Sequence, residues 1–225
     1  MRIVTWNCNG GFRNKFEYIK KYNADIYVIQ ECENPLTSDD NSYKEFAQNY
    51  MWVGYKNKGL GIFGNQNIKL TNNNWDTYGL EWFISCTVND NFTLLGLWGS
   101  GNYIEDIYVY LKIHQRQLEG LEKVVVCGDF NSNSIWDKKH KRRTHSAVVE
   151  DLEKLNLYSC YHLKNDEVQG SETKPTFYLY RKSNKGYHID YCFCSKEHLK
   201  DLQIGEFSKW IKLSDHMPLV VDVDI

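Results

Sequence analysis

Short apolar runs bounded by Gly, Asn or Asp recur along this chain of 225 residues, a pattern typical of β-strands. The pattern predicts strands at Arg2–Trp6, Asp25–Gln30, Trp52–Tyr55, Gly59–Phe63, Trp82–Val88, Phe92–Trp98, Lys123–Cys127, Thr176–Tyr180, Ile189–Cys194 and Leu219–Asp224. The sequence Asn89-Asp90-Asn91, between two of these runs, predicts a hairpin turn. The Asn-rich stretch Asn65–Asp76 is expected to be a surface loop.

Three segments instead repeat apolar residues every three or four positions, which indicates helices. They lie around Phe12–Ile19, Ile104–Leu111 and Val148–Leu155. Strands outnumber helices and several strands follow one another directly, so a doubly wound parallel sheet fits poorly. The pattern predicts a layered α+β fold or a mixed-sheet sandwich. No repeat, Pro-rich linker or change in composition marks a boundary, and we expect residues 1–225 to form one domain.

Composition restricts how the chain could handle a charged substrate. Its 27 Lys and Arg against 29 Asp and Glu give a formal net charge of −2, which excludes the global basic field of a protein that coats DNA. A polyanion must then be bound locally, by a metal ion or a confined basic patch. The seven cysteines lie mostly in apolar runs and are expected to be free. No run reaches transmembrane length and no signal peptide is evident, so the expected location is the cytoplasm.

Polar residues stand two positions apart at the edges of three predicted strands. The pairs are Asn7 with Asn9, Asp129 with Asn131, and His188 with Asp190. In extended backbone, residues two apart project to the same face. Each pair is therefore expected to present both side chains on one side of a sheet.

Two further polar positions lie at strand ends. Glu31 ends the apolar run before it, and Asp215-His216 comes just before the last strand. The clusters contain carboxylates, amides and imidazoles but no Cys, a donor set that suits Mg²⁺ or Mn²⁺ rather than Zn²⁺. Any one cluster alone also fits an ordinary turn or a solvated rim. Their joint occurrence in this order indicates a metal-dependent active site.

The same clusters resemble the endonuclease/exonuclease/phosphatase superfamily, whose members have a DNase I-like fold. The matching motifs are Trp6-Asn7-x-Asn9-Gly10, Gln30-Glu31, Gly128-Asp129-Phe130-Asn131, His188-Ile189-Asp190-Tyr191 and Ser214-Asp215-His216-x-Pro218. They span essentially the whole chain in the order of the family. The resemblance implies a four-layer α+β sandwich, with two mixed β-sheets packed face to face and flanked by helices. It also implies hydrolysis of phosphoesters with Mg²⁺ (or Mn²⁺).

The resemblance implies which side chains face the metal and the phosphate. Glu31 is similar to the family's principal metal ligand, with Asp215 and Asn9 near the same or a second metal position. Asn7 and Asn131 resemble the amides that donate hydrogen bonds to the phosphate oxygens. Amides suit this task because they donate without adding a charge that titrates.

The resemblance also implies the groups that handle protons. Asp129 is similar to the carboxylate that orients and deprotonates the attacking water. His216 resembles the imidazole that contacts the phosphate, and Asp190 its orienting carboxylate. The sequence does not decide between Asp129 and His216 as the base.

At two positions the sequence departs from the family pattern, which affects the roles that the resemblance implies. Many members carry His or Tyr at the end of the strand before the Gly-Asp-x-Asn motif, whereas the strand here runs Phe92–Trp98 without either. Ser100, Asn102 or Tyr103 could take that role, or it is missing. His188 stands where members that act on DNA often carry Arg.

A nuclease, endo- or exonuclease, is the leading expectation for the substrate, because a basic run follows the Asp129 motif and aromatic residues flank the motifs. The expected substrate contacts are Lys138, Lys139, Lys141, Arg142, Arg143, Trp136, Tyr178 and His188. Nucleic acid is thus the expected partner, with no membrane and no obligate protein partner. A phosphoesterase for small or inositol-type phosphates is the alternative, and a catalytically inactive binding module is a third hypothesis.

Overall fold

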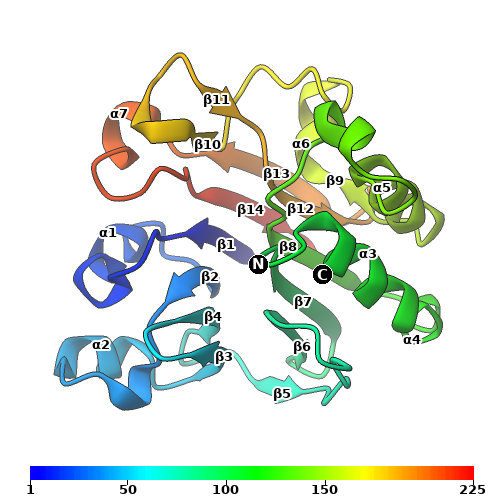
Figure 1. The fold of residues 1–225 in the computed structure, drawn as a ribbon. Coiled ribbons are helices and arrows are strands. Elements are labelled where there is room, and N and C mark those ends of the chain that lie inside the picture. The colour runs from blue at the N-terminus through cyan, green and yellow to red at the C-terminus, as the bar shows by residue number, and fades with distance from the viewer.

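The computed structural model describes residues 1–225 as two six-stranded sheets packed face to face, with helices on the outer faces (Figure 1). The first sheet has the order β13 (Leu199–Ile204), β14 (Leu219–Val223), β1 (Arg2–Asn7), β2 (Ile26–Cys32), β4 (Lys58–Gly64) and β3 (Tyr50–Tyr55). Only β1 and β2 pair in parallel, and the other neighbours are antiparallel.

The second sheet is also mixed. Its order is β5 (Leu70–Asn72), β6 (Phe83–Val88), β7 (Phe92–Trp98), β8 (Val124–Asp129), β12 (Asp190–Cys194) and β9 (Tyr158–Ser159). Here β7 and β8 form the parallel pair. A separate ribbon joins β10 (Phe177–Tyr178) to β11 (Gly186–Tyr187). The predicted α+β sandwich of two mixed sheets is confirmed.

Helices cover the two outer faces. One side carries α1 (Phe16–Lys20), α2 (Asn41–Phe46) and α7 (Phe207–Trp210), and the other α3 (Ile104–Ile113), α4 (Gln115–Glu119) and α5 (His145–Lys154). The remaining helix is α6 (Cys160–Asn165), and 3-10 turns occur at η1 (Phe12–Asn14), η2 (Pro35–Thr37), η3 (Ser134–Lys139) and η4 (Leu179–Arg181). No helix has the length and apolar character needed to cross a bilayer.

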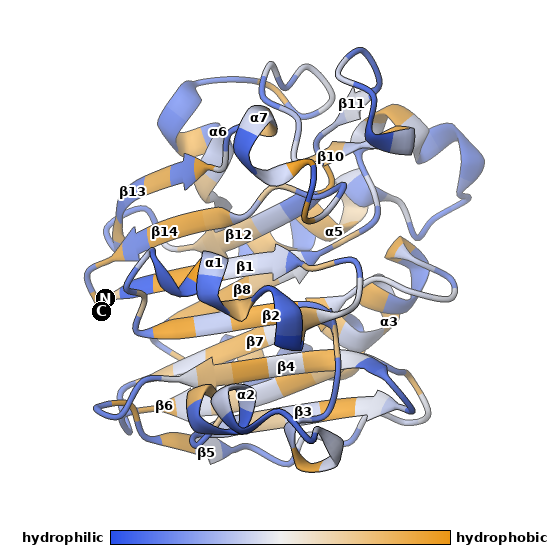
Figure 2. Cartoon of the chain, turned by 90° about the vertical axis from the view of Figure 1, so that its left-hand side faces the viewer, coloured by the Kyte–Doolittle hydropathy of each residue, from blue (hydrophilic) through white to orange (hydrophobic).

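Alternation along the strands divides the core into layers. On β7, Leu94 packs between the sheets while Leu95 faces the helices of the outer layer. Strands that are buried on both faces read as continuous apolar runs, and Figure 2 shows hydrophobic strands bordered by hydrophilic loops. All seven cysteines are free and buried.

Several predicted elements change in detail. The strand expected at Thr176–Tyr180 is confined to β10, because Tyr180 and Arg181 have φ near 56° and 57° and turn the chain into η4. The loop expected at Asn65–Asp76 contains the short edge strand β5. The helix expected around Phe12–Ile19 is broken into η1 and α1. In contrast, the hairpin at residues 89–91 is confirmed, with Asn89 and Asp90 at positive φ.

Candidate active site

The end of β8 presents Asp129 and Asn131, and its geometry depends on the glycine before them. Gly128 has φ 153°, and a Cβ there would lie 1.9 Å from the backbone oxygen of Leu97 on β7. Only glycine tolerates this approach. Asn131 then turns the chain with φ 47°, so that its backbone N–H and its Nδ2 donate to the two Asp129 carboxylate oxygens, each at 2.8 Å. The motif therefore holds the Asp129 carboxylate from two sides.

Asn7, at the end of β1, connects the two sheets at this rim. Its side chain is buried, and its Nδ2 donates to Asp129 Oδ2 at 2.9 Å and to Glu31 Oε1 at 3.3 Å. The backbone N–H of Asn9 donates to Asn7 Oδ1 at 3.0 Å. Since the oxygen of the amide is taken by an N–H donor, the amide NH₂ must face the carboxylates.

Glu31 points into the site because β2 has an irregularity at this residue. The register between β2 and β4 shifts between Gln30 and Cys32, and Glu31 has φ 62°. A β-bulge re-aims a side chain, and strained backbone of this kind concentrates at functional sites. The Glu31 side chain is 18% exposed, and its Oε2 forms an ion pair with Lys58 Nζ at 2.6 Å.

Asp215 joins the same rim through the loop that follows β1. Asn9, with φ 53°, donates from Nδ2 to Asp215 Oδ1 at 2.7 Å. The neighbouring Ser214 donates from Oγ to the Asn7 carbonyl at 2.7 Å and accepts from the His216 N–H at 3.0 Å. Ser214 thus fixes the 214–216 segment against β1, a role that the motif alone did not indicate.

Asp190 and His216 form a buried pair. His216 Nδ1 lies 3.1 and 3.0 Å from the two Asp190 carboxylate oxygens. The backbone N–H groups of Ile189 and Asp190 both donate to Thr176 Oγ1 at 3.0 Å, which fixes the start of β12. The ring of Phe177 packs 4.7 Å from the imidazole. Because Nδ1 is engaged, Nε2 is the nitrogen left to contact a substrate.

The buried charges at this rim influence each other. Burial raises the pKa of the Asp129 carboxyl to about 7, since the nearby His216 and the hydrogen bonds from Asn7 and Asn131 offset burial only in part. Burial opposes a charged imidazole at His216, but Asp190 and Asp129 outweigh it and raise the pKa of His216 to about 9. Near neutral pH, Asp129 can therefore exchange a proton while His216 stays cationic.

Two groups of side chains could hold a divalent cation. The first is Asp129, Asp190 and His216, whose ligand atoms lie within 4.8 Å of one another. These groups already have partners, since His216 pairs with Asp190, and Asp129 accepts three hydrogen bonds from Asn7 and Asn131. The second is the set expected from the sequence, Glu31 with the hydrogen-bonded Asn9 and Asp215, whose side chains are less buried and offer only carboxylate and amide oxygens. The second group fits a hard cation better.

Comparison with known proteins agrees with this geometry. The model of the Endonuclease/Exonuclease/phosphatase family matches residues 4–216. The chain belongs to this family. It is therefore a hydrolase of the endonuclease/exonuclease/phosphatase type, and the expected family is confirmed. No curated protein matches the chain.

Solved structures share the fold over their full length. A 3′-5′ exonuclease (NExo) from Neisseria meningitidis is 20% identical with a TM-score of 0.73, and each chain is covered completely. A structure of the 3′ phosphatase NExo from Neisseria bound to a product DNA hairpin is 18% identical, with a TM-score of 0.72 and complete coverage of both chains. An AP endonuclease from Archaeoglobus fulgidus is 17% identical with a TM-score of 0.66, again over 100% of both chains. These similarities establish the DNase I-like fold.

Trp98 occupies the strand end where many members of the endonuclease/exonuclease/phosphatase family carry His or Tyr. The strand register places Trp98 opposite Asp129, which in turn lies opposite Asp190, so the three side chains share the inner face at the rim. The Trp98 ring lies 5.0 Å from that of Trp82. An indole pair therefore fills this position. Of the proposed substitutes, Asn102 instead donates from its side chain to Asp106.

The basic run is exposed next to the site motif of this family member. Lys138, Lys139, Lys141, Arg142 and Arg143 are all exposed and form no ion pairs. They lie in and after η3, which follows Asn131, and Trp136 in η3 packs 5.3 Å from the ring of Tyr187. The expected contacts of these residues with a substrate stay predictions.

Two other expected substrate contacts are less exposed than the basic run. His188 is buried, with its Nδ1 bonded to the Lys174 carbonyl at 2.9 Å, and it precedes β12, which begins at Asp190. The expected contact of His188 with a substrate stays a prediction. Tyr178 is half-buried against Phe207, with ring centroids 4.5 Å apart. Its backbone N–H donates to the Asp215 carbonyl at 2.8 Å, so it supports the site through its main chain.

A buried Glu172–His162 pair lies behind His188 and gives a prediction on stability. Burial opposes ionisation of Glu172, but hydrogen bonds from His162, the Gly170 N–H and Asn133 outweigh it and lower the pKa of Glu172 to about 2. This contribution to stability is complete above about pH 4.5 and is lost as pH falls toward about 2. Glu172→Gln should lower the free energy of unfolding by about 2 kcal/mol near neutral pH.

Urea denaturation of the wild type and Glu172→Gln across acidic and neutral pH checks this prediction. The difference between the two proteins should shrink as pH falls below the ordinary pKa of glutamate. A difference that stays constant down to about pH 3 would contradict the role of the ionised carboxylate.

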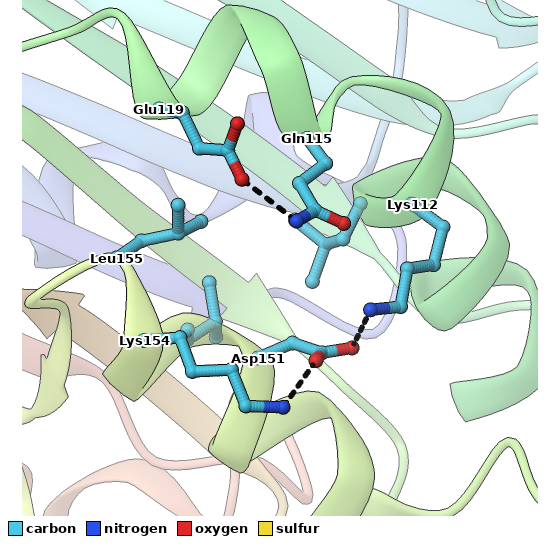
Figure 3. A pocket seen from close by; sticks show the side chains of 8 residues that line it. Lys112, Gln115, Glu119, Asp151, Lys154 and Leu155 are labelled. Atoms are coloured by element: carbon cyan, nitrogen blue, oxygen red, sulfur yellow. Dashed lines mark hydrogen bonds and ion pairs between the residues drawn. The ribbon is translucent and has the colours of Figure 1, made fainter.

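A small pocket in the outer helical layer contains no cluster of side chains like that of the candidate active site. It lies between α3, α4 and α5 and has a volume of about 50 Å³ (Figure 3). Asp151 pairs with both Lys112 at 2.8 Å and Lys154 at 3.1 Å, and Gln115 donates to Glu119 at 2.7 Å. Its polar groups therefore satisfy each other at the surface.

Proposed function

We propose that this chain is a divalent-metal-dependent phosphodiester hydrolase that acts as a nuclease on DNA or RNA. One observation carries the proposal: the carboxylate of Asp129, bound by Asn7 and Asn131, lies beside the Asp190–His216 pair at the rim where both sheets meet. Neutral donors, a cationic imidazole and a carboxylate able to take a proton suit attack of water on a phosphate.

In this proposal Glu31, Asp215 and Asn9 hold Mg²⁺ or Mn²⁺. The bound ion supplies positive charge against the phosphate oxygens, where negative charge grows during hydrolysis. The oxygen-only donor set and the strained φ of 62° at Glu31 support this assignment.

The remaining residues position the phosphate and move the proton. Asn7 and Asn131 direct their Nδ2 groups toward the same centre and would donate to the phosphate oxygens. Asp129 would take the proton of the attacking water, because its pKa of about 7 suits a base near neutral pH. His216, with a pKa of about 9, would donate a charged hydrogen bond from Nε2.

Nucleic acid is the substrate class that the surface supports best. The exposed basic run could neutralise several phosphates of a polyanionic strand, and the indole of Trp136 is half-exposed beside it. Among the structural neighbours, a 3′ phosphatase is bound to a product DNA hairpin, and the others are an exonuclease and an AP endonuclease. Both endonuclease and exonuclease activity are compatible with this proposal.

The basic run gives a prediction on salt dependence. Changing Lys141, Arg142 and Arg143 together to Gln should weaken DNA binding and flatten its dependence on salt, by up to about 0.9 in the logarithmic slope for each lost phosphate contact. Fluorescence anisotropy with labelled DNA over a salt series measures both the affinity for DNA and the slope of its salt dependence. A control variant with Lys20, the last residue of α1, and Lys21, which follows it, changed to Gln should behave as the wild type. Equal slopes in all three proteins would show that the basic run does not contact the phosphates of DNA.

A substrate panel tests the proposed function. With Mg²⁺, the protein should cleave at least one of single-stranded, duplex and abasic DNA or RNA. If these are untouched while inositol phosphates or a generic phosphodiester are hydrolysed, the chain is a phosphoesterase for small substrates. Binding without turnover under any divalent ion would indicate an inactive binding module.

A further inference from the structure

Lys58 contacts the residue that we propose as the principal metal ligand. Its Nζ lies 2.6 Å from Glu31 Oε2, and the other oxygen of that carboxylate accepts from Asn7. Both oxygens of Glu31 therefore accept from donors of the chain itself. The inference below rests on the proposed role of Glu31 as a metal ligand.

The ammonium group and a metal ion compete for the same carboxylate. A dication bound to Glu31 would bring two positive centres within a few ångströms of each other in a half-buried site, which is strongly repulsive. Lys58 can leave this position because its side chain is 58% exposed and forms no other ion pair. The ammonium should therefore move away from Glu31 when the metal binds.

The backbone of Lys58 limits how far its ammonium can move. Lys58 is the first residue of β4 and pairs with Tyr55 across the β3–β4 hairpin, directly followed by Gly59, which pairs with Gly54. A Cβ on Gly59 would lie 2.4 Å from the Val53 carbonyl, so the strand is tightly fitted at this point. The flexible part is the four-carbon stem of the lysine. Its charge must therefore stay at the edge of the metal site.

We propose that Lys58 competes with the metal ion for Glu31 and, when the metal displaces its ammonium, forms an ion pair with a substrate phosphate. A compact, hydrated cation on a flexible stem suits phosphate binding. The exchange keeps the charge of Glu31 compensated in both states. Lys58 is thus a positioning residue for the substrate, and its competition for Glu31 lowers the affinity for the metal.

The test compares Lys58→Met with Lys56→Met, which removes a lysine two residues away on the same hairpin. Lys56 lies over the ring of Tyr55 at 5.0 Å and forms no ion pair, so it controls for general loss of charge. Calorimetry with Mn²⁺ alone should show several-fold tighter metal binding in Lys58→Met than in the other proteins, because a competitor is removed.

The second readout is DNA binding. In Mn²⁺ and in an Asp129→Asn background, which prevents cleavage, the Lys58→Met change should lower the affinity for short fluorescein-labelled single-stranded DNA several-fold. The slope of its salt dependence should decrease by about 0.7, the value for one phosphate contact on a single strand. Lys56→Met should leave metal affinity unchanged.

Each contrary result identifies what fails. Unchanged Mn²⁺ affinity in Lys58→Met, with Mn²⁺ binding lost in Glu31→Gln, would overturn the inference and leave the metal site intact. Tighter Mn²⁺ binding with an unchanged salt slope would overturn the phosphate contact. Unchanged Mn²⁺ affinity in Glu31→Gln would instead overturn the proposed metal site on which the inference rests.

Discussion

Replacing Asp129 with Asn is expected to lower the rate of hydrolysis by about 10²–10⁴-fold, because an amide cannot take the proton of the attacking water. The change preserves the size of the side chain but turns one carboxylate oxygen into an NH₂ group, which faces a donor from Asn7 or Asn131. The burial that raises the pKa of Asp129 to about 7 also means that folding gains little from its charge. The free energy of unfolding should therefore fall by about 1–3 kcal/mol, the cost of one unpaired buried donor.

Single-turnover kinetics and thermal melts of the same preparation separate these effects. Asp90→Asn is a matched control, since Asp90 lies at the tip of the β6–β7 hairpin with its side chain 66% exposed and pairs with Lys69. The control should retain wild-type activity. Full activity in Asp129→Asn would show that this carboxylate does not take the proton of the attacking water.

Replacing Glu31 with Gln is expected to weaken Mn²⁺ and Mg²⁺ binding by at least about tenfold, because a charged ligand to a hard cation is lost. The rate at saturating substrate should fall with it, and added metal should restore part of it. Calorimetry measures the affinity, and activity over a metal titration measures the rescue.

Glu33→Gln is the matched control for this prediction. Glu33 lies two residues further along the chain and is buried, where it pairs with Arg13 at 2.9 Å and accepts from the Phe12 N–H at 2.8 Å. Its loss should lower stability without changing metal affinity. Equal effects of both variants on metal binding would contradict the assignment of Glu31.

The sequence predicted the strands of the layered fold well where burial of apolar side chains alone decides the structure. The apolar run Phe92–Trp98 matches β7 in both bounds, because a strand buried on both faces appears in the sequence as a continuous apolar run. The short edge strand β5 and the bend at Tyr180 were missed, since each depends on local backbone angles that the hydrophobic pattern does not encode.

The structure brings predicted site residues together, but partly by another backbone geometry than the one expected. Asn7 with Asn9 and Asp129 with Asn131 do meet, but by tight turns at positive φ rather than by extended backbone. Both turns bring an N–H back to the preceding side chain. His188 lies before β12 begins and is buried, with its Nδ1 bonded to the Lys174 carbonyl.

The sequence pattern could not predict contacts between segments that lie far apart in the chain. Nothing around Lys58 distinguishes it from other surface lysines, and its contact with Glu31 arises only because β2 and β4 are neighbours in the sheet. Trp98 likewise gains its place opposite Asp129 from the parallel pairing of β7 with β8. Register between strands, rather than residue type, decides both.

Metal-dependent hydrolysis of a labelled oligonucleotide tests the central claim most directly. After treatment with EDTA the wild type should be inactive, and Mg²⁺ or Mn²⁺ should restore cleavage in the wild type but not in Asp129→Asn. Cleavage that persists in EDTA, or wild-type cleavage by Asp129→Asn, would contradict a metal-dependent nuclease built on this site.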